Sequence, residues 1–369
     1  MARKRGPSSR RPRHKSSRKQ DTTKPPSLRR GERFVEAFPL VDGAPVATWT
    51  RVKSRPRPDR HMMGILPAGA IALKPHSPTG PADLRAIRQP AVPGTHFLLV
   101  GEGFPDTQPQ RFFDRAEKVA AAMLLEEPFK SLEASIAIHA LFLPLAGTAV
   151  VDIGCDRSEA NKARLKPTLF ATQCCVDGST PHLWCGDEDA VRKVVGSALS
   201  EGGRAIGDYQ FLAVLIDSAS YGGAGSIPNA TAKPRIAWAT TDHALSMLIL
   251  MHELGHAFGL QDEYETPQAE PIKPWRNISR FDRPDATPWQ ELVTAPSRDG
   301  VTCPADTPWN GDPDIVGTFE GAGYHHEGRY RPTHQCRMRD LAADFCVVCA
   351  DHIKSAINSG HVGKVREEN

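Results

Sequence analysis

The strongest constraint on this chain is the pentapeptide HELGH, from His252 to His256, inside an otherwise apolar segment. Residues 244–259 read ALSMLILMHELGHAFG, which predicts a helix that is buried on nearly all sides, with Asp242 placed to cap its start. An unpaired Glu253 and two imidazoles are costly to bury in such a helix. Histidines four residues apart project from one helix face, so a single metal ion can partner all three polar groups.

The third ligand is predicted by Gly259, which lies three residues after His256, where the helix must end and the chain must turn back. In the pattern H-E-x-x-H-x-x-G-x-x-H the third ligand lies six residues after the second histidine, and that position is Asp262. A carboxylate oxygen binds zinc at about the same distance as an imidazole nitrogen. Glu263 is the alternative ligand, but the register that Gly259 sets favours Asp262.

This ligand set predicts a hydrolase that activates water. His252, His256 and Asp262 would hold one catalytic Zn²⁺ and leave its fourth position to water. The ion lowers the pKa of that water and polarises the scissile carbonyl. Glu253 then acts as the general base and returns the proton to the leaving amine.

Strands and helices alternate along the middle of the chain. Continuous apolar runs of strand length occur at residues 96–101, 136–145, 211–217 and 235–240. Helical spacing of apolar residues occurs at residues 109–129, with an end at Pro128, and at residues 186–199. This alternation predicts a mostly parallel or mixed sheet with helices on its faces.

The segments before residue 96 have a different composition. Residues 1–33 carry thirteen Lys or Arg and only two acidic residues, so of the chain's net charge of +3 this segment holds +11 and the rest holds −8. With almost no apolar residues, it is expected to be a disordered basic tail, and contact with nucleic acid or an anionic surface is the alternative. Residues 34–95, rich in Pro and Gly, are expected to form a leading segment or a small module with short strands at residues 34–40 and 69–73.

We assign the catalytic domain to residues 96–369. No stretch approaches the roughly 20 apolar residues that a membrane span needs. No apolar signal-peptide segment follows the basic start, so the sequence predicts a cytoplasmic chain by default. Oligomeric state is not indicated.

The chain resembles the IgA-peptidase-type zinc metallopeptidases of bacteria in four ordered segments. These segments are GEGFPDTQPQRFFDRAEKVAAAMLLEEPF (101–129), FLAVLIDSASYGGAG (211–225), HELGHAFGLQDEY (252–264) and GAGYHHEGRYRPTHQCRMRDLAADFCVVC (321–349). The resemblance runs from about residue 97 to the end of the chain. Four motifs in the same order are far more specific than HExxH alone.

The resemblance implies a zinc endopeptidase acting on a protein or peptide, with zinc on His252, His256 and Asp262. It implies a metzincin-like α+β domain with two lobes: a sheet-containing upper lobe, the zinc helix along the floor of the cleft, and an irregular, cysteine-containing lower lobe. It also implies that Met338 belongs to a tight turn beneath the metal, whereas ordinary core packing is the alternative for this methionine. The family is typically secreted, so the compartment stays open.

Substrate contacts are expected at two places. The segment Tyr221–Gly225, with Tyr221, Gly222 and Gly223, follows a strand and could pair with a peptide backbone, or it could be a flexible loop. Tyr330 could donate a hydrogen bond to the oxyanion, with packing as the alternative role. The adjacent His325 and His326 lie in a polar segment and are expected to be exposed rather than ligands.

The chain has eight cysteines, whose thiol or disulfide states the sequence leaves open: Cys155, Cys174, Cys175, Cys185, Cys303, Cys336, Cys346 and Cys349. The last four could form a structural metal site, since C-x2-C is a ligand spacing. No second C-x2-C or H-x3-H pair accompanies them, so disulfides or free buried thiols are favoured together.

Two other functions remain open. HExxH specifies an activated water and not the bond that it attacks, so a zinc hydrolase of a non-peptide amide is one alternative. A non-catalytic binding protein stabilised by zinc is the other. An intact Glu253 and a set of three ligands argue against it, because a structural zinc normally has four protein ligands.

Overall fold

The computed structural model describes most of the chain after residue 69, together with several short strands outside that part. The described ranges are 70–147, 150–176, 178, 180–225, 234–265, 275–294 and 315–359, with strand residues 32–37, 40–41, 44–45, 48–53 and 302–303. Nearly all of the predicted basic tail, residues 1–31, lies outside them. Within the described residues, no helix combines the length and apolar character needed to cross a membrane.

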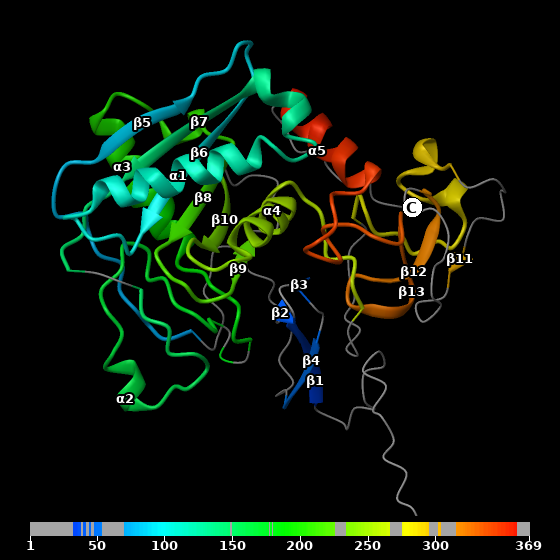
Figure 1. The fold of residues 1–369 in the computed structure, drawn as a ribbon, viewed down its shortest axis with the longest axis horizontal. Helices are drawn as coiled ribbons and strands as arrows, with labels where there is room; N and C mark the ends of the chain where they lie inside the picture. The colour runs from blue at the N-terminus through cyan, green and yellow to red at the C-terminus, as the bar shows by residue number, and fades with distance from the viewer. Residues whose placement is uncertain are drawn as a thin grey trace, which may run out of the picture.

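A six-stranded sheet forms the centre of the fold (Figure 1). Its strand order is β5 (Asp83–Arg88), β7 (Ile136–Phe142), β6 (Thr95–Glu102), β8 (Phe211–Ile216), β10 (Arg235–Thr240) and β9 (Gly223–Gly225). The four inner strands are parallel, and the two edge strands β5 and β9 are antiparallel to their neighbours. The predicted mixed, mostly parallel sheet is thus confirmed, and it includes β5, from the segment assigned to the leading module.

Both faces of the sheet are covered, which explains why its inner strands are apolar runs rather than alternating patterns. Side chains alternate across β6: Phe97 and Leu99 pack into one core with α1 (Pro109–Met123), α4 (Ser246–Ala257) and α5 (Val347–Ser359). Leu98 and Val100 pack into a second core with α3 (Glu188–Glu201). Figure 1 shows α1 lying across the face of the sheet and α4 beside β9 and β10. Helix α4, which carries the HELGH motif, is therefore placed against the antiparallel edge of the sheet.

The remaining elements are short. In the leading segment β1 (Glu32–Ala37) pairs with β4 (Thr48–Lys53), and β2 (Leu40–Val41) pairs with β3 (Ala44–Pro45). Elsewhere lie helix α2 (Glu159–Lys162) and the 3-10 helices η1 (Lys130–Ser135), η2 (Ile206–Asp208), η3 (Pro284–Ala286) and η4 (Gln290–Leu292). The C-terminal part contains β11 (Thr302–Cys303), β12 (Thr318–Ala322) and β13 (His325–Arg331).

Three local predictions differ from the structure. Residues 70–73 form no strand. Helix α1 ends at Met123, before the predicted stop at Pro128, because residues 124–129 form turns. The C-terminal part was expected to be irregular, yet it contains the β12–β13 hairpin and α5. The hairpin was missed because β13 reads HHEGRYR, which has no alternating apolar signal.

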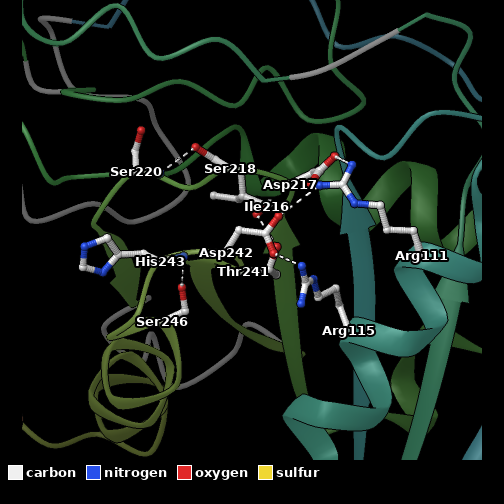
Figure 2. A network of polar contacts seen from close by, with 10 residues as sticks. All are labelled: Arg111, Arg115, Ile216, Asp217, Ser218, Ser220, Thr241, Asp242, His243 and Ser246. Carbon is white, nitrogen blue, oxygen red and sulfur yellow. Dashed lines mark hydrogen bonds and ion pairs between the residues drawn. The ribbon is translucent and has the colours of Figure 1, made fainter.

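Asp242 does not cap helix α4, so that prediction is wrong. Helix α4 begins only at Ser246, and its N-cap Leu245 makes no side-chain capping bond. The Asp242 carboxylate instead lies 3.0 Å from Arg111 Nη2 and 2.5 Å from Arg115 Nη2, both on α1 (Figure 2). The ion pairs join α1 to the segment that leads into α4.

Arg111 also holds the carboxyl end of β8. Its two terminal nitrogens donate to both oxygens of Asp217, at 2.9 and 2.6 Å. The Asp217 side chain is 6% exposed. Desolvation raises the pKa of Asp217, and the Arg111 guanidinium opposes this rise. Arg111 is thus the main compensation for a carboxylate that the fold buries.

We predict that Arg111→Met lowers the free energy of unfolding by about 2 kcal/mol. Removing one partner of a buried ion pair costs roughly 3 to 5 kcal/mol, and the partial exposure of Arg111 reduces that figure. Urea unfolding followed by circular dichroism measures the change. Lys118→Met, at an exposed position of the same helix, is the control. Equal stability of the two variants would show that Asp217 does not need this partner.

Candidate metal centre

Two backbone carbonyls set the orientation of the motif histidines. His252 Nδ1 lies 3.0 Å from the Arg337 oxygen, and His256 Nδ1 lies 3.0 Å from the Leu260 oxygen. A carbonyl can only accept, so each Nδ1 carries the proton and each neutral ring keeps a lone pair on Nε2. Both Nε2 atoms face Asp262.

The turn after α4 brings Asp262 to the histidines. Gly259 has a φ of +93°, a conformation that favours glycine, and the Leu260 amide donates to the Gly255 carbonyl at 3.0 Å. After this turn, Asp262 Oδ1 lies 3.0 Å from His252 Nε2 and 3.3 Å from His256 Nε2. The ligand atoms of these three residues lie within 4.8 Å of one another.

These three groups fit a bound cation. With both Nδ1 atoms donating elsewhere, two nitrogen lone pairs and a carboxylate oxygen converge on one point. Asp262 is 3% exposed, and its Oδ1 contacts both Nε2 atoms. Either a proton or a metal ion must offset the cost of burying these lone pairs and the carboxylate charge together. Two imidazoles and a carboxylate are a ligand set that zinc accepts.

The adjacent acid, Glu263, faces away from the histidines. It is fully buried, and its Oε1 accepts a hydrogen bond of 2.9 Å from the Asn277 side chain. Consecutive residues of an extended segment point to opposite sides, so Asp262 and Glu263 belong to different environments. Of the two sequence candidates, only Asp262 lies with the motif histidines.

Glu253 lies on the side of α4 that faces β9. A Cβ added to Gly225 would come within 3.2 Å of Glu253 Oε2, so the carboxylate lies immediately below this strand. Desolvation raises the pKa of Glu253, and the neighbouring His252 and His256 lower it. The net rise favours a carboxyl group that can take up a proton.

Met338 packs against α4 at Gly255. Its side chain is fully buried, and a Cβ on Gly255 would clash with its Sδ atom. The Met338 carbonyl accepts from the Glu263 amide at 2.7 Å. The turn containing Met338 therefore contacts both α4 and the segment that carries Asp262.

Tyr324 is a site residue that the sequence analysis missed. Its hydroxyl donates to Asp262 Oδ2, and its backbone amide donates to the Tyr264 carbonyl at 2.9 Å. Burial and the Asp262 charge raise the pKa of Tyr324 well above its ordinary value, so the phenol stays protonated. Its φ of +68° is unusual for a tyrosine. The run Gly-Ala-Gly before it was the available signal, because glycines often surround such turns.

Tyr330, the tyrosine named from sequence, has a different neighbour. Its hydroxyl lies 3.4 Å from Glu320 Oε1 on the adjacent strand β12. His325 and His326 lie on β13, half-buried and exposed respectively, and neither belongs to the ligand cluster. The structure thus places Tyr324, rather than Tyr330, beside Asp262.

The glycine segment proposed for substrate contact forms strand β9. A Cβ on Gly223 would lie 3.0 Å from Glu253 Cγ, and one on Gly225 would lie 2.6 Å from His256 Cβ. The missing side chains therefore let the strand pack directly on α4. Gly223 is already paired on its outer side, since it donates to His182 and accepts from Trp184, both at 3.2 Å. The ring of Tyr221 packs edge-on against His182.

His252 and His256 of α4 lie with Asp262 next to the buried Glu253 carboxylate. This arrangement of side chains is that of a metal-dependent hydrolase. The model of the IgA peptidase M64 family matches residues 88–314 and 310–357. The chain therefore belongs to the IgA peptidase M64 family and is a metallopeptidase. Comparison with curated proteins finds no match to the chain. Of the functions that the sequence left open, family membership favours peptide bonds over another amide and an enzyme over a binding protein.

We predict that zinc affinity rises with pH between 7 and 9. In the metal-free site burial lowers the pKa of His256, but the Asp262 carboxylate outweighs this effect and raises that pKa to about 9. Below pH 9 one proton must therefore leave when zinc binds, which gives roughly a tenfold change in affinity per pH unit. Competition with a zinc chelator of known affinity, corrected for free zinc, measures the slope. Equal affinities at pH 7 and pH 8 would contradict the His256–Asp262 pair.

Proposed function

We propose that this metallopeptidase is a zinc-dependent endopeptidase in which Glu253 is the general base. The observation that carries the proposal is the convergence of His252 Nε2, His256 Nε2 and Asp262 Oδ1 beside the Glu253 carboxylate. Zinc would supply a Lewis acid that lowers the pKa of water and polarises the substrate carbonyl. The protein's own groups would then handle the proton and the charge.

Glu253 is positioned for proton transfer. Its raised pKa brings a carboxylate closer to neutral, where a group can both accept and return a proton efficiently. The proton would pass from water to Glu253 and then to the leaving amine. Tyr324, held protonated, would orient Asp262 through its hydroxyl. We therefore assign Tyr324 a positioning role. The contact of the Tyr330 hydroxyl with Glu320 gives no support to the oxyanion role expected for Tyr330.

An extended peptide would pair with the outer edge of β9 near Gly225. Alternate residues of a strand direct their backbone groups to the same side, so Gly223 and Gly225 share the outer side. The pairing of Gly223 with residues 182–184 occupies the first of these positions. Gly225 lies over Glu253 and His256, where a paired peptide bond would reach the metal centre. This assignment narrows the five-residue segment expected from sequence to its last residue.

We also propose the metzincin-like division into two lobes. The six-stranded sheet with α1, α3 and α4 would form the upper lobe. The β12–β13 hairpin, the cysteine-containing turn and α5 would form the lower lobe. The Asp262 carbonyl accepts a hydrogen bond of 2.9 Å from the Gly323 amide. This bond supports the proposal because it joins the segment after α4 to the hairpin.

We predict that Glu253→Gln lowers kcat by about 10² to 10⁴-fold while zinc stays bound. The amide keeps the size of the side chain but cannot accept the proton, and the three ligands are unchanged. Cleavage of a denatured protein and zinc content by elemental analysis are measured together. Glu327→Gln, an exposed residue of β13, is the control. Full activity in Glu253→Gln would exclude this residue as the base.

Asp262→Ala should act differently, because it removes a ligand and not the base. We expect loss of about one zinc per chain and loss of activity, with partial recovery of both at high zinc concentration. Dialysis against increasing free zinc, followed by metal and activity assays, gives both values. Retention of all zinc in Asp262→Ala would show that this carboxylate does not bind the catalytic ion.

A further inference from the structure

A second group of metal-ligand side chains lies behind the metal centre. Glu263, Cys336, Cys346 and Cys349 each offer one ligand atom, and these four atoms lie within 4.8 Å of one another. All four residues are buried, with Cys346 the most exposed at 9%. The three cysteines are thiols and form no disulfide. We propose that these residues bind a second, structural zinc ion.

The geometry of the group suits a closed tetrahedral site. Ligand atoms about 2.3 Å from a tetrahedral zinc lie roughly 3.8 Å apart, within the spacing that the side chains already have. Cys346 and Cys349 form the C-x2-C pair at the start of α5, and Cys336 comes from the preceding turn. The Cys346 amide donates to Cys336 Sγ at 3.4 Å, a bond that stabilises a thiolate. Four protein ligands leave no open position, as expected of a structural site.

The Glu263 carboxylate supplies an independent sign of a missing cation. Its Oε1 accepts from Asn277 at 2.9 Å and lies 3.2 Å from Cys349 Sγ. Its Oε2 is buried and has no hydrogen-bond partner among the described residues. An orphaned oxygen of this kind is costly inside a protein. A zinc ion among the thiols would satisfy it.

The surroundings favour the negative charge of such a site. Three thiolates and a carboxylate around Zn²⁺ carry a net charge of −2. Arg331, 2% exposed, acts on the Glu263 carboxylate electrostatically. The guanidinium of Arg339 donates to the Glu263 backbone carbonyl at 3.3 Å. Arg331 therefore supplies a positive charge near the carboxylate ligand, whereas Arg339 is paired with Glu265.

The sequence argument against a second site does not apply to this arrangement. That argument required a second C-x2-C or H-x3-H pair near the cysteines. Here the fourth ligand is Glu263, which is distant in sequence and is brought in by the turn after α4. Disulfides or free buried thiols were together the favoured alternatives, and the three cysteines are free. A thiol is only a weak hydrogen-bond donor, so free thiols alone would leave Glu263 Oε2 without a strong partner.

The second ion would hold the catalytic centre together from behind. Glu263 follows Asp262 directly, and Cys336 lies two residues before Met338. Arg337 lies between Cys336 and Met338, and its carbonyl accepts a hydrogen bond from His252 Nδ1. One ion would thus link three segments: the one that carries Asp262, the turn beneath α4, and the start of α5. It takes no part in the reaction.

Cobalt substitution of the full-length chain tests the proposal. The catalytic ligands are nitrogen and oxygen, so an intense near-ultraviolet thiolate-to-cobalt band can come only from the cysteine site. We expect this band in the wild-type protein and its loss in Cys349→Ser. Cys174→Ser, at a buried thiol outside the group, should retain the band.

Zinc content separates the second site from the catalytic one. Wild-type protein should hold about two zinc ions, and the double variant His252→Ala/His256→Ala should keep about one. X-ray absorption on that double variant should show a zinc ion with about three sulfur neighbours. A wild-type cobalt protein without the thiolate band, a double variant without zinc, or a disulfide between any of the three cysteines would overturn the proposal. These outcomes leave the catalytic assignment untouched, and the metal data on wild type and double variant decide the question even where Cys349→Ser fails to fold.

Discussion

The structure depends on burying a helix that carries two histidines and a glutamate, α4. Helix α4 packs between strand β9 and the turn of Met338, and glycine occurs wherever these contacts are closest. Gly223 and Gly225 admit the strand above the helix, and Gly255 admits the Met338 sulfur below it. A Cβ at any of these positions would come closer than 3.0 Å to an atom of the neighbouring segment. The close packing keeps the two imidazoles in one orientation, which a metal site requires.

The segment after α4, which carries Asp262 and Glu263, places one acid in each of the two groups of metal-ligand side chains. Asp262 and Glu263 are neighbours in sequence, yet they face opposite sides. Asp262 completes the histidine site, and Glu263 reaches the three C-terminal cysteines. Two backbone hydrogen bonds hold this segment in place. One runs from the Glu263 amide to the Met338 carbonyl, and the other from the Gly323 amide to the Asp262 carbonyl. The C-terminal part therefore supports the candidate metal centre, although it contributes none of the three side chains His252, His256 and Asp262.

Local patterns with a fixed geometry could be predicted from the sequence. The spacing of His252, Glu253 and His256 and the Gly259 turn indicated the ligand register, and buried apolar runs indicated the parallel strands. Contacts between distant segments could not be predicted. Asp242 has the composition of a helix cap, but two arginines of α1 compete for its carboxylate. Tyr324 and the fourth member of the cysteine group depend on long-range folding, so no local spacing indicates them.

Anomalous X-ray diffraction at the zinc edge, on crystals of the zinc-loaded protein, is the most direct test of the catalytic site. Our account predicts an anomalous peak within bonding distance of His252 Nε2, His256 Nε2 and Asp262 Oδ1, about 2.0 to 2.2 Å from each. Glu253 should lie beside this peak without bonding to it. An anomalous peak bonded to Glu253, or histidines without a peak in zinc-replete crystals, would contradict the assignment.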